Sequence, residues 1–313
     1  MNQRRSILLL SIACLLLTPI GLLAQQRPDS SFIPTVASAA FDVASGPLVA
    51  IDAAHHNFHT LNGHYATLAA LLEADGFRVQ AWATPFTTDS LAEIDILVIA
   101  NAGSDDQSSW VLPTASAFLE EEASAIEAWV EQGGSLLLIA DHMPAAGAAA
   151  ALASRFGIHF TNGYTYQPRE KGLTGDLFTR QEGLLRDHPF TRGRHQDERI
   201  DTVMTFTGQG FQASSEVDTV LVFGPGAVTF LPVDAEAAFS AQTPRVHSGG
   251  WLHGATVHRG QGRVAFFGEA AMFSAQVAGP KRRPMGMNHP KARQNKQFAL
   301  NVFRWLAGLL DER

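Results

Sequence analysis

Residues 133–144 read GGSLLLIADHMP, and this stretch decides the fold class. Two glycines end a segment whose apolar residues recur at helical spacing, and an uninterrupted apolar run then leads into Asp141 and His142. The preceding apolar positions are Leu119, Ala123, Ile126 and Val130. The pattern predicts an amphipathic helix, a strand over 135–141 that is buried on both faces, and a polar turn beyond it.

The same alternation repeats outward from this stretch. Apolar runs predict strands over 47–52, 78–82, 94–100 and 262–269, and helical spacing predicts a helix over 63–74. A final helix carries the stripe Phe298, Val302, Trp305, Leu306 and Leu309. Strands without polar alternation, separated by helices, indicate an α/β fold with a mostly parallel sheet covered by helices on both sides.

The middle and the start of the chain follow other patterns. Residues 160–262 mix polar loops with short β-like runs, which predicts an irregular segment whose antiparallel strands extend the sheet. Residues 1–24 combine a short basic start with an apolar run and a small residue, Ala24, so they read as a signal peptide cleaved there, or as a membrane anchor if uncleaved. Residues 25–45 lack a sustained period and read as a linker or loosely docked arm before a domain over 46–313.

The charge and the cysteine content of the chain limit the classes of function that it can have. The net charge is −7, and the first 24 residues hold only Arg4 and Arg5, so the rest carries −9 and suggests no general affinity for nucleic acid or anionic lipid. The single cysteine, Cys14, lies in the leader, so an exported body holds no thiol and no disulfide. We therefore expect an exported protein, periplasmic or extracellular, with no membrane span after cleavage.

Polar side chains follow the predicted strands. Asp52 ends the first strand and precedes His55, His56 and His59, while the later strands end in Asn101, in Asp141 with His142, and in Glu269. Ligands of open parallel sheets bind beyond the carboxyl ends of the strands. We therefore expect these side chains to line one pocket for a small polar molecule or glycan.

The order of these elements resembles the class I glutamine amidotransferase-like superfamily, in a branch of exported bacterial proteins without the catalytic cysteine. The resemblance spans about residues 46–312, and GGSLLLIADHMP and GEAAMFSAQ (268–276) are its most specific parts. It implies a flavodoxin-like sheet with an antiparallel extension. No cysteine or serine stands in the turn IADHMPAAG, and Lys291 replaces the acid after His289 and Pro290, so glutamine amidotransfer is not expected.

Within the predicted pocket, His55, Asp141, His142 and Glu269 are the candidate catalytic residues, and the candidate ligand-binding residues are Asp52, His56, Asn101 and Asn288. His55, His59 and Asp141 form a candidate set of ligands for a divalent metal such as zinc. Each has a structural alternative: histidines that satisfy the turn or face water, Asp141 as a helix cap, and Glu269 as an acceptor of backbone hydrogen bonds.

Two functions remain open on the sequence alone. In the first, the protein binds a small polar or carbohydrate-like ligand and hydrolyses it with a histidine–carboxylate pair or a metal-activated water. Trp110 and Trp251 are the candidates for stacking on a sugar ring. The second is a non-catalytic binding or assembly module of the cell envelope. The basic segment 279–296, with six Lys or Arg and no acid, either draws an anionic substrate or is a solvated loop.

Overall fold

The computed structural model describes residues 26–104, 110–168, 175–214 and 216–310. The predicted signal peptide, 1–24, lies outside these residues. No helix in the described part of the chain is long and apolar enough to cross a bilayer.

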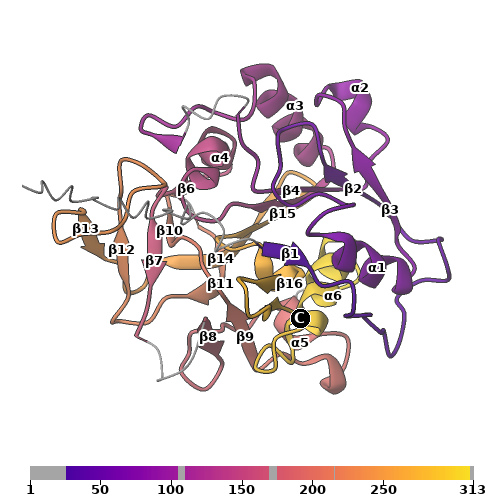
Figure 1. Ribbon diagram of the computed structural model, residues 1–313. Helices are drawn as coiled ribbons and strands as arrows, with labels where there is room; N and C mark the ends of the chain where they lie inside the picture. The colour runs from indigo at the N-terminus through magenta and orange to yellow at the C-terminus, as the bar shows by residue number, and fades with distance from the viewer. Residues whose placement is uncertain (1–25, 105–109, 169–174, 215, 311–313) are drawn as a thin grey trace, which may run out of the picture.

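A nine-stranded sheet organises the molecule, and its five parallel strands are those predicted from the apolar runs (Figure 1). They are β2 (Leu48–Asp52), β3 (Arg78–Trp82), β4 (Ile96–Ala100), β5 (Ser135–Ile139) and β15 (Gly262–Phe267). Their order is β3-β2-β4-β5-β15, which is the flavodoxin-like order 2-1-3-4-5 counted along the chain. The predicted fold class is confirmed.

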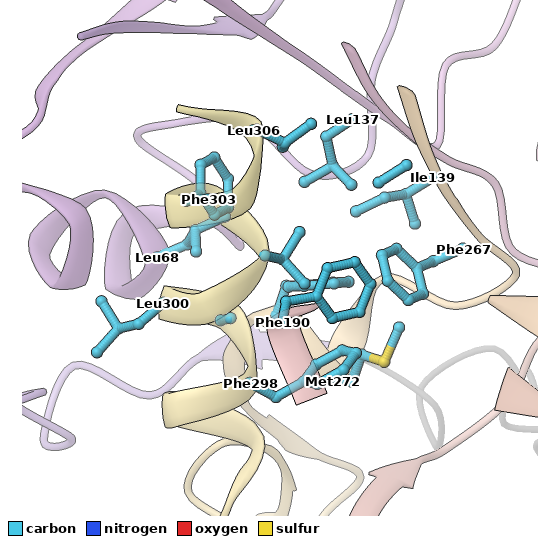
Figure 2. Packing of buried hydrophobic residues seen from close by; sticks show 14 of the residues in the cluster. Leu68, Leu137, Ile139, Phe190, Phe267, Met272, Phe298, Leu300, Phe303 and Leu306 are labelled. Atoms are coloured by element: carbon cyan, nitrogen blue, oxygen red, sulfur yellow. The ribbon is translucent and has the colours of Figure 1, made fainter. Parts of the chain in front are cut away.

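Helices cover both faces of this sheet, which is why every residue of β4 and β5 is buried. Figure 1 shows α3 (Glu120–Glu131) and α4 (Ala145–Ser154) on one side and α1 (Ala66–Ala74) and α6 (Asn295–Leu306) on the other. The short helices are α2 (Thr88–Leu91), α5 (Pro189–Arg192), η3 (Gln196–Glu198) and η4 (Ala271–Phe273). Figure 2 shows the core under α6, where Phe298 and Phe303 pack with Leu137, Ile139 and Phe267 of the strands.

Antiparallel strands extend the sheet beyond β15, as predicted for the middle of the chain. β14 (Leu252–Arg259) pairs with β15, and both β10 (Phe211–Ala213) and β11 (Asp218–Val222) pair with β14. The last strand, β6 (Ile158–Phe160), pairs with β10. A small sheet joins β7 (Tyr164–Tyr166), β12 (Val228–Phe230) and β13 (Arg245–His247), and a hairpin joins β8 (Asp176–Thr179) to β9 (Thr202–Thr205).

The N-terminal segment, predicted as a linker or a loosely docked arm, is docked on the fold through a paired strand. Its strand β1 (Gln26–Pro28) pairs with β16 (Ala275–Ala278), which also pairs with β17 (Arg283–Gly286). Farther along, the carbonyl of Ser38 accepts a hydrogen bond of 2.8 Å from the buried Arg304, and Phe41 packs edge-on against Phe77. This pairing was not predicted, because strand addition and backbone hydrogen bonds need no periodic side-chain pattern.

Candidate functional site

The carboxyl ends of the parallel strands carry the predicted polar residues, but on two faces of the sheet. Successive side chains of a strand point to opposite faces. Asp52, the last residue of β2, lies with Ala50 on the face covered by α3 and α4, whereas Asp141 and Glu269, beyond the ends of β5 and β15, are close enough to raise the pKa of Tyr65, which is buried in the core on the side of α1 and α6. The predicted single pocket is therefore not formed, and the set divides into two clusters.

The first cluster, here called the His55 lock, consists of Asp52, His55 and Glu122. His55 Nδ1 lies 3.0 Å from both carboxylate oxygens of Asp52, and its Nε2 lies 3.1 Å from Oε1 of Glu122. Since both ring nitrogens face carboxylate oxygens, both carry protons. Burial lowers the pKa of His55, but the hydrogen bonds and charges of Asp52 and Glu122 outweigh it and raise this pKa above its ordinary value.

The packing around His55 leaves no space for a ligand beside its ring. His55 is sandwiched between the rings of Phe86, 4.8 Å away, and Phe118, 4.7 Å away. Glu122 also accepts backbone N–H bonds from Phe86 and Leu119, the latter at the start of α3. All three lock residues are buried, so Asp52 and His55 are structural here and do not join Asp141 in a common site.

The second cluster, the Asp141 site, is built on the turn after β5. Asn101 clamps Asp141 from two directions: its Oδ1 accepts the Asp141 N–H at 2.8 Å, and its Nδ2 donates to Asp141 Oδ2 at 2.8 Å. The Ala270 N–H donates to Oδ1 at 2.6 Å. Asp141 does not cap α4, since both oxygens are directed to these other partners, so the cap alternative is not realised.

The side chain of Asp141 is half-buried. Burial raises the pKa of Asp141 to about 7, against the opposing effect of the bonds from Asn101 and Ala270. A carboxyl with this pKa exchanges a proton near neutral pH, as acid–base catalysis requires.

Glu269 lies beside this carboxyl but is fully buried. Its two oxygens accept the N–H groups of Ala271 and Met272, each at 2.8 Å, so it shapes the turn into η4. Burial and the charge of Asp141 raise the pKa of Glu269 well above its ordinary value. Its observed contacts are those of the structural alternative.

His59 joins the Asp141 site through Asn101. Its Nδ1 lies 3.3 Å from Asn101 Nδ2, and its Nε2 lies 3.1 Å from Gln276 Nε2. Both amide nitrogens are donors, and a neutral imidazole accepts through one nitrogen only, so His59 accepts from one of these two amides. Burial lowers the pKa of His59 to about 3, so the ring is neutral. It holds Asn101 in place and carries no charge.

His142 marks the outer side of the Asp141 site. It is half-buried, its Nδ1 donates to the Met143 carbonyl at 2.8 Å, and its ring stacks on Tyr164 at 4.0 Å. The Tyr164 hydroxyl donates to the same carbonyl at 3.1 Å. Phe239, which is 39% exposed, packs edge-on against Tyr164. Phe239 is thus the exposed ring of this aromatic group, and His142 links the group to the turn that carries Asp141.

The remaining predicted residues lie elsewhere. His56 is exposed on a backbone with φ of 46°, in the left-handed region. Asn288 donates to Asp29 of the arm and to the Gln276 carbonyl, each at 2.8 Å. Neither residue contacts Asp141 through a hydrogen bond among the described residues.

The structure does not bring the three predicted metal ligands together. His55 is held by Asp52 and Glu122, while His59 and Asp141 each bind Asn101, so the three do not form a ligand cluster. Across the described ranges, no group of three or more His, Cys, Asp or Glu is arranged to hold a metal ion. Sequence reasoning also missed Glu122, Tyr164 and Gln276, whose partners are 67, 22 and 217 residues away along the chain.

Comparison with known proteins finds likeness in structure alone. No protein-family model and no curated protein matches the chain. The mmIFT52 N-terminal domain superposes with a TM-score of 0.57 at 15% identity, covering 83% of this chain and 97% of that domain. A ThuA-like protein from Bacteroides uniformis (TM-score 0.46, 13% identity, 86% and 95% covered) and a cytoplasmic protein from Salmonella typhimurium (0.47, 14%, 83% and 98%) are also similar. At 15% identity, the superposition on the mmIFT52 N-terminal domain shows a likeness of fold alone.

Proposed function

We propose that the chain is an exported protein with an amidotransferase-like scaffold that binds a small polar, carbohydrate-like ligand at the Asp141 site, where Asp141 serves as the acid–base group in its hydrolysis. The observation that carries the proposal is the clamped, half-buried Asp141 with a pKa of about 7 at the carboxyl edge of the parallel strands.

Asp141 suits this role better than the other candidate carboxyls. Asp52 is paired inside the His55 lock, and Glu269 is fully buried with both oxygens on backbone N–H groups. Each Asp141 oxygen accepts one described hydrogen bond, which leaves a lone pair on each. The carboxylate would take a proton from an attacking water, and the resulting acid would return it to the leaving oxygen.

The aromatic group that His142 links to the Asp141 turn supports a carbohydrate-like ligand. His142 and Tyr164 are stacked, and Phe239 and Trp110 are 39% and 41% exposed. The segments that carry these rings are joined by hydrogen bonds. The Tyr164 hydroxyl donates to the Ala235 carbonyl, and the Ala235 N–H donates to the Trp110 carbonyl. Exposed rings stack on the apolar faces of sugars while neighbouring polar groups bind hydroxyls.

Two further parts of the proposal, the amidotransferase-like scaffold and export, are supported by the sequence and the strand order. The flavodoxin-like strand order and the turn after β5 support the amidotransferase-like scaffold, and the absence of any thiol beyond Cys14 argues against amidotransfer. The apolar run within residues 1–24 supports export.

The rival function is an assembly module that binds a protein. It is favoured by six exposed apolar residues on adjoining segments: Trp110, Val111, Leu112, Val233, Phe239 and Val246. These segments are joined by hydrogen bonds, including Leu112 N–H to the Val233 carbonyl at 2.9 Å. Apolar residues gathered in this way are typical of protein-binding surfaces.

A binding screen separates the two. Calorimetry with neutral and acidic sugars, and assays with chromogenic glycosides across neutral pH, would compare the wild type with Asp141→Asn and with Asp42→Asn, a change at an exposed aspartate. We expect a sugar that binds the wild type and Asp42→Asn but not Asp141→Asn. Equal binding by all three proteins, or no binding by any, would overturn the ligand site.

A further inference from the structure

The histidine-rich turn of residues 55–59 is attached to the segment that follows β4. The Phe58 N–H donates to the Asn101 carbonyl at 3.0 Å, and the Gly103 N–H donates to the His55 carbonyl at 2.9 Å. The His55 lock, whose ring is held at both nitrogens, fixes the start of the turn. The turn therefore supports Asn101 through the backbone, from a position that is itself anchored in the core.

Asn101 needs this support because its backbone has a φ of 50°, in the left-handed region that residues other than glycine rarely adopt. Its own N–H donates to the Ile139 carbonyl at 3.0 Å, so bonds to β5 and from the turn hold its backbone on both sides. From this conformation its side-chain amide binds both the N–H and the carboxylate of Asp141. The turn thus helps to maintain the geometry from which Asn101 clamps Asp141.

His59 is the side chain of the turn that faces the Asn101 amide, and its two neighbouring amides differ in their freedom. The Asn101 amide cannot turn, because its oxygen accepts from the Asp141 N–H while its nitrogen donates to the Asp141 carboxylate. The Gln276 amide can turn, since its Oε1 has no hydrogen-bond partner among the described residues, and the Ser274 hydroxyl beside it donates as well as accepts. Turned, Oε1 accepts from Nε2–H of His59, and Nδ1 of His59 accepts the second N–H of Asn101.

We propose that His59 is a positioning residue of the Asp141 site, which receives one N–H of the Asn101 amide and thereby directs the other at the Asp141 carboxylate. His59 is fully buried, so it acts through Asn101 and not on a ligand. The inference rests on the proposed function, in which the Asp141 carboxyl exchanges a proton. It gives the histidine-rich turn a role in that site without a metal and without a charged imidazole at position 59.

The Asn101 bond matters because it acts on the proton affinity of Asp141. A donor to a carboxylate stabilises the charged form, and the bond from Asn101 lowers the pKa of Asp141 against the larger effect of burial. A loosened Asn101 amide should therefore raise this pKa further and leave Asp141 protonated at neutral pH. The other titratable groups beside Asp141 in the described part of the chain are Glu269, Tyr65 and its neighbour His142, and all three are kept in every variant of the test.

Titration of the Asp141 carboxyl carbon by ¹³C NMR measures the effect without any ligand. His59→Leu removes the acceptor, and His59→Asn restores it, because the amide oxygen of the new side chain takes the δ position that Nδ1 held. Asn101→Gly removes the clamping amide and tolerates the positive φ. The matched control is His188→Leu, since His188 is also a buried imidazole with a pKa of about 3 but lies at the start of α5.

We expect the Asp141 midpoint to rise by about one pH unit in His59→Leu, the size of effect that loss of a hydrogen bond to a charged group produces, and at least as far in Asn101→Gly. His59→Asn and His188→Leu should keep the wild-type midpoint. His59→Phe, which keeps a ring, replaces His59→Leu if the latter does not fold.

An unchanged midpoint in the variant that lacks the acceptor, or an equal rise in His188→Leu, would overturn the role of His59. A wild-type midpoint near 3.8 would count against the proposed function alone, because the difference between the wild type and His59→Leu would still decide whether His59 positions Asn101.

Discussion

The His55 lock is a buried ion pair whose contribution to stability can be isolated by one substitution. His55→Ala removes the imidazolium and leaves Asp52 and Glu122 facing an unfilled, buried space between Phe86 and Phe118. The side chains of the three lock residues are 8% exposed or less, so water cannot replace the lost partner.

The magnitude follows from breaking a buried ion pair, which typically costs about 3–5 kcal/mol because the remaining charges are uncompensated. For a domain of this size, that loss lowers Tm by roughly 6–20 °C. The pH dependence has a definite sign. Since the folded-state pKa of His55 is raised above 6.5, its protonation stabilises the fold fully below pH 6.5, and this contribution is lost as pH rises through the folded-state value.

Urea unfolding and calorimetry at several pH values between 6 and 9 would measure the difference between the wild type and His55→Ala. The matched control is His159→Ala, at an exposed position of β6, with an expected effect within about 0.5 kcal/mol. The stability difference for His55→Ala should be largest at the acidic end. A loss below about 1 kcal/mol, or a difference that grows with pH, would refute the reasoning.

Two other buried groups give predictions that can be checked in the same unfolding experiments. The pKa of His59 falls from 6.5 to about 3 on folding, so between these pH values the unfolded chain binds a proton that the folded chain does not. His59→Gln should therefore reduce the loss of stability on acidification by about 1.4 kcal/mol per pH unit between pH 6 and 4. An unchanged slope of stability against pH would contradict this. Arg304 binds Asp75 at 2.6 Å and Glu198 at 2.7 Å, so Arg304→Leu should cost about 3–5 kcal/mol in urea unfolding, and a loss below 1 kcal/mol would count against a buried ion network.

The parallel core was predictable because its central strands β4 and β5 are continuous apolar runs, and burial on both faces requires that composition, whereas the edge strand β3 includes Arg78 and Gln80 and is partly exposed. The polar residues at the strand ends were predictable for the same reason, since the runs end there. Asn101, Asp141 and Glu269 accordingly lie at one edge of the sheet.

The grouping of those residues was not predictable from their positions alone. The face to which a residue points depends on where each strand ends, and a single step moves a side chain across the sheet. Asp52 thus meets Glu122, 70 residues later in the sequence, through His55 instead of meeting Asp141. The pairing of Gln26 with Ala278 was also not predictable from the sequence, because it consists of backbone hydrogen bonds between two segments that share no sequence pattern.

The central claim is that Asp141 titrates near neutral pH. Titration of its carboxyl carbon by ¹³C NMR, assigned by comparison with Asp141→Asn, tests this directly. The account predicts a midpoint at about pH 7, with His59 remaining neutral through that transition. A midpoint near the ordinary aspartate value of 3.8 would contradict it, because Asp141 would then be a carboxylate throughout the neutral range, unsuited to exchanging a proton with a ligand.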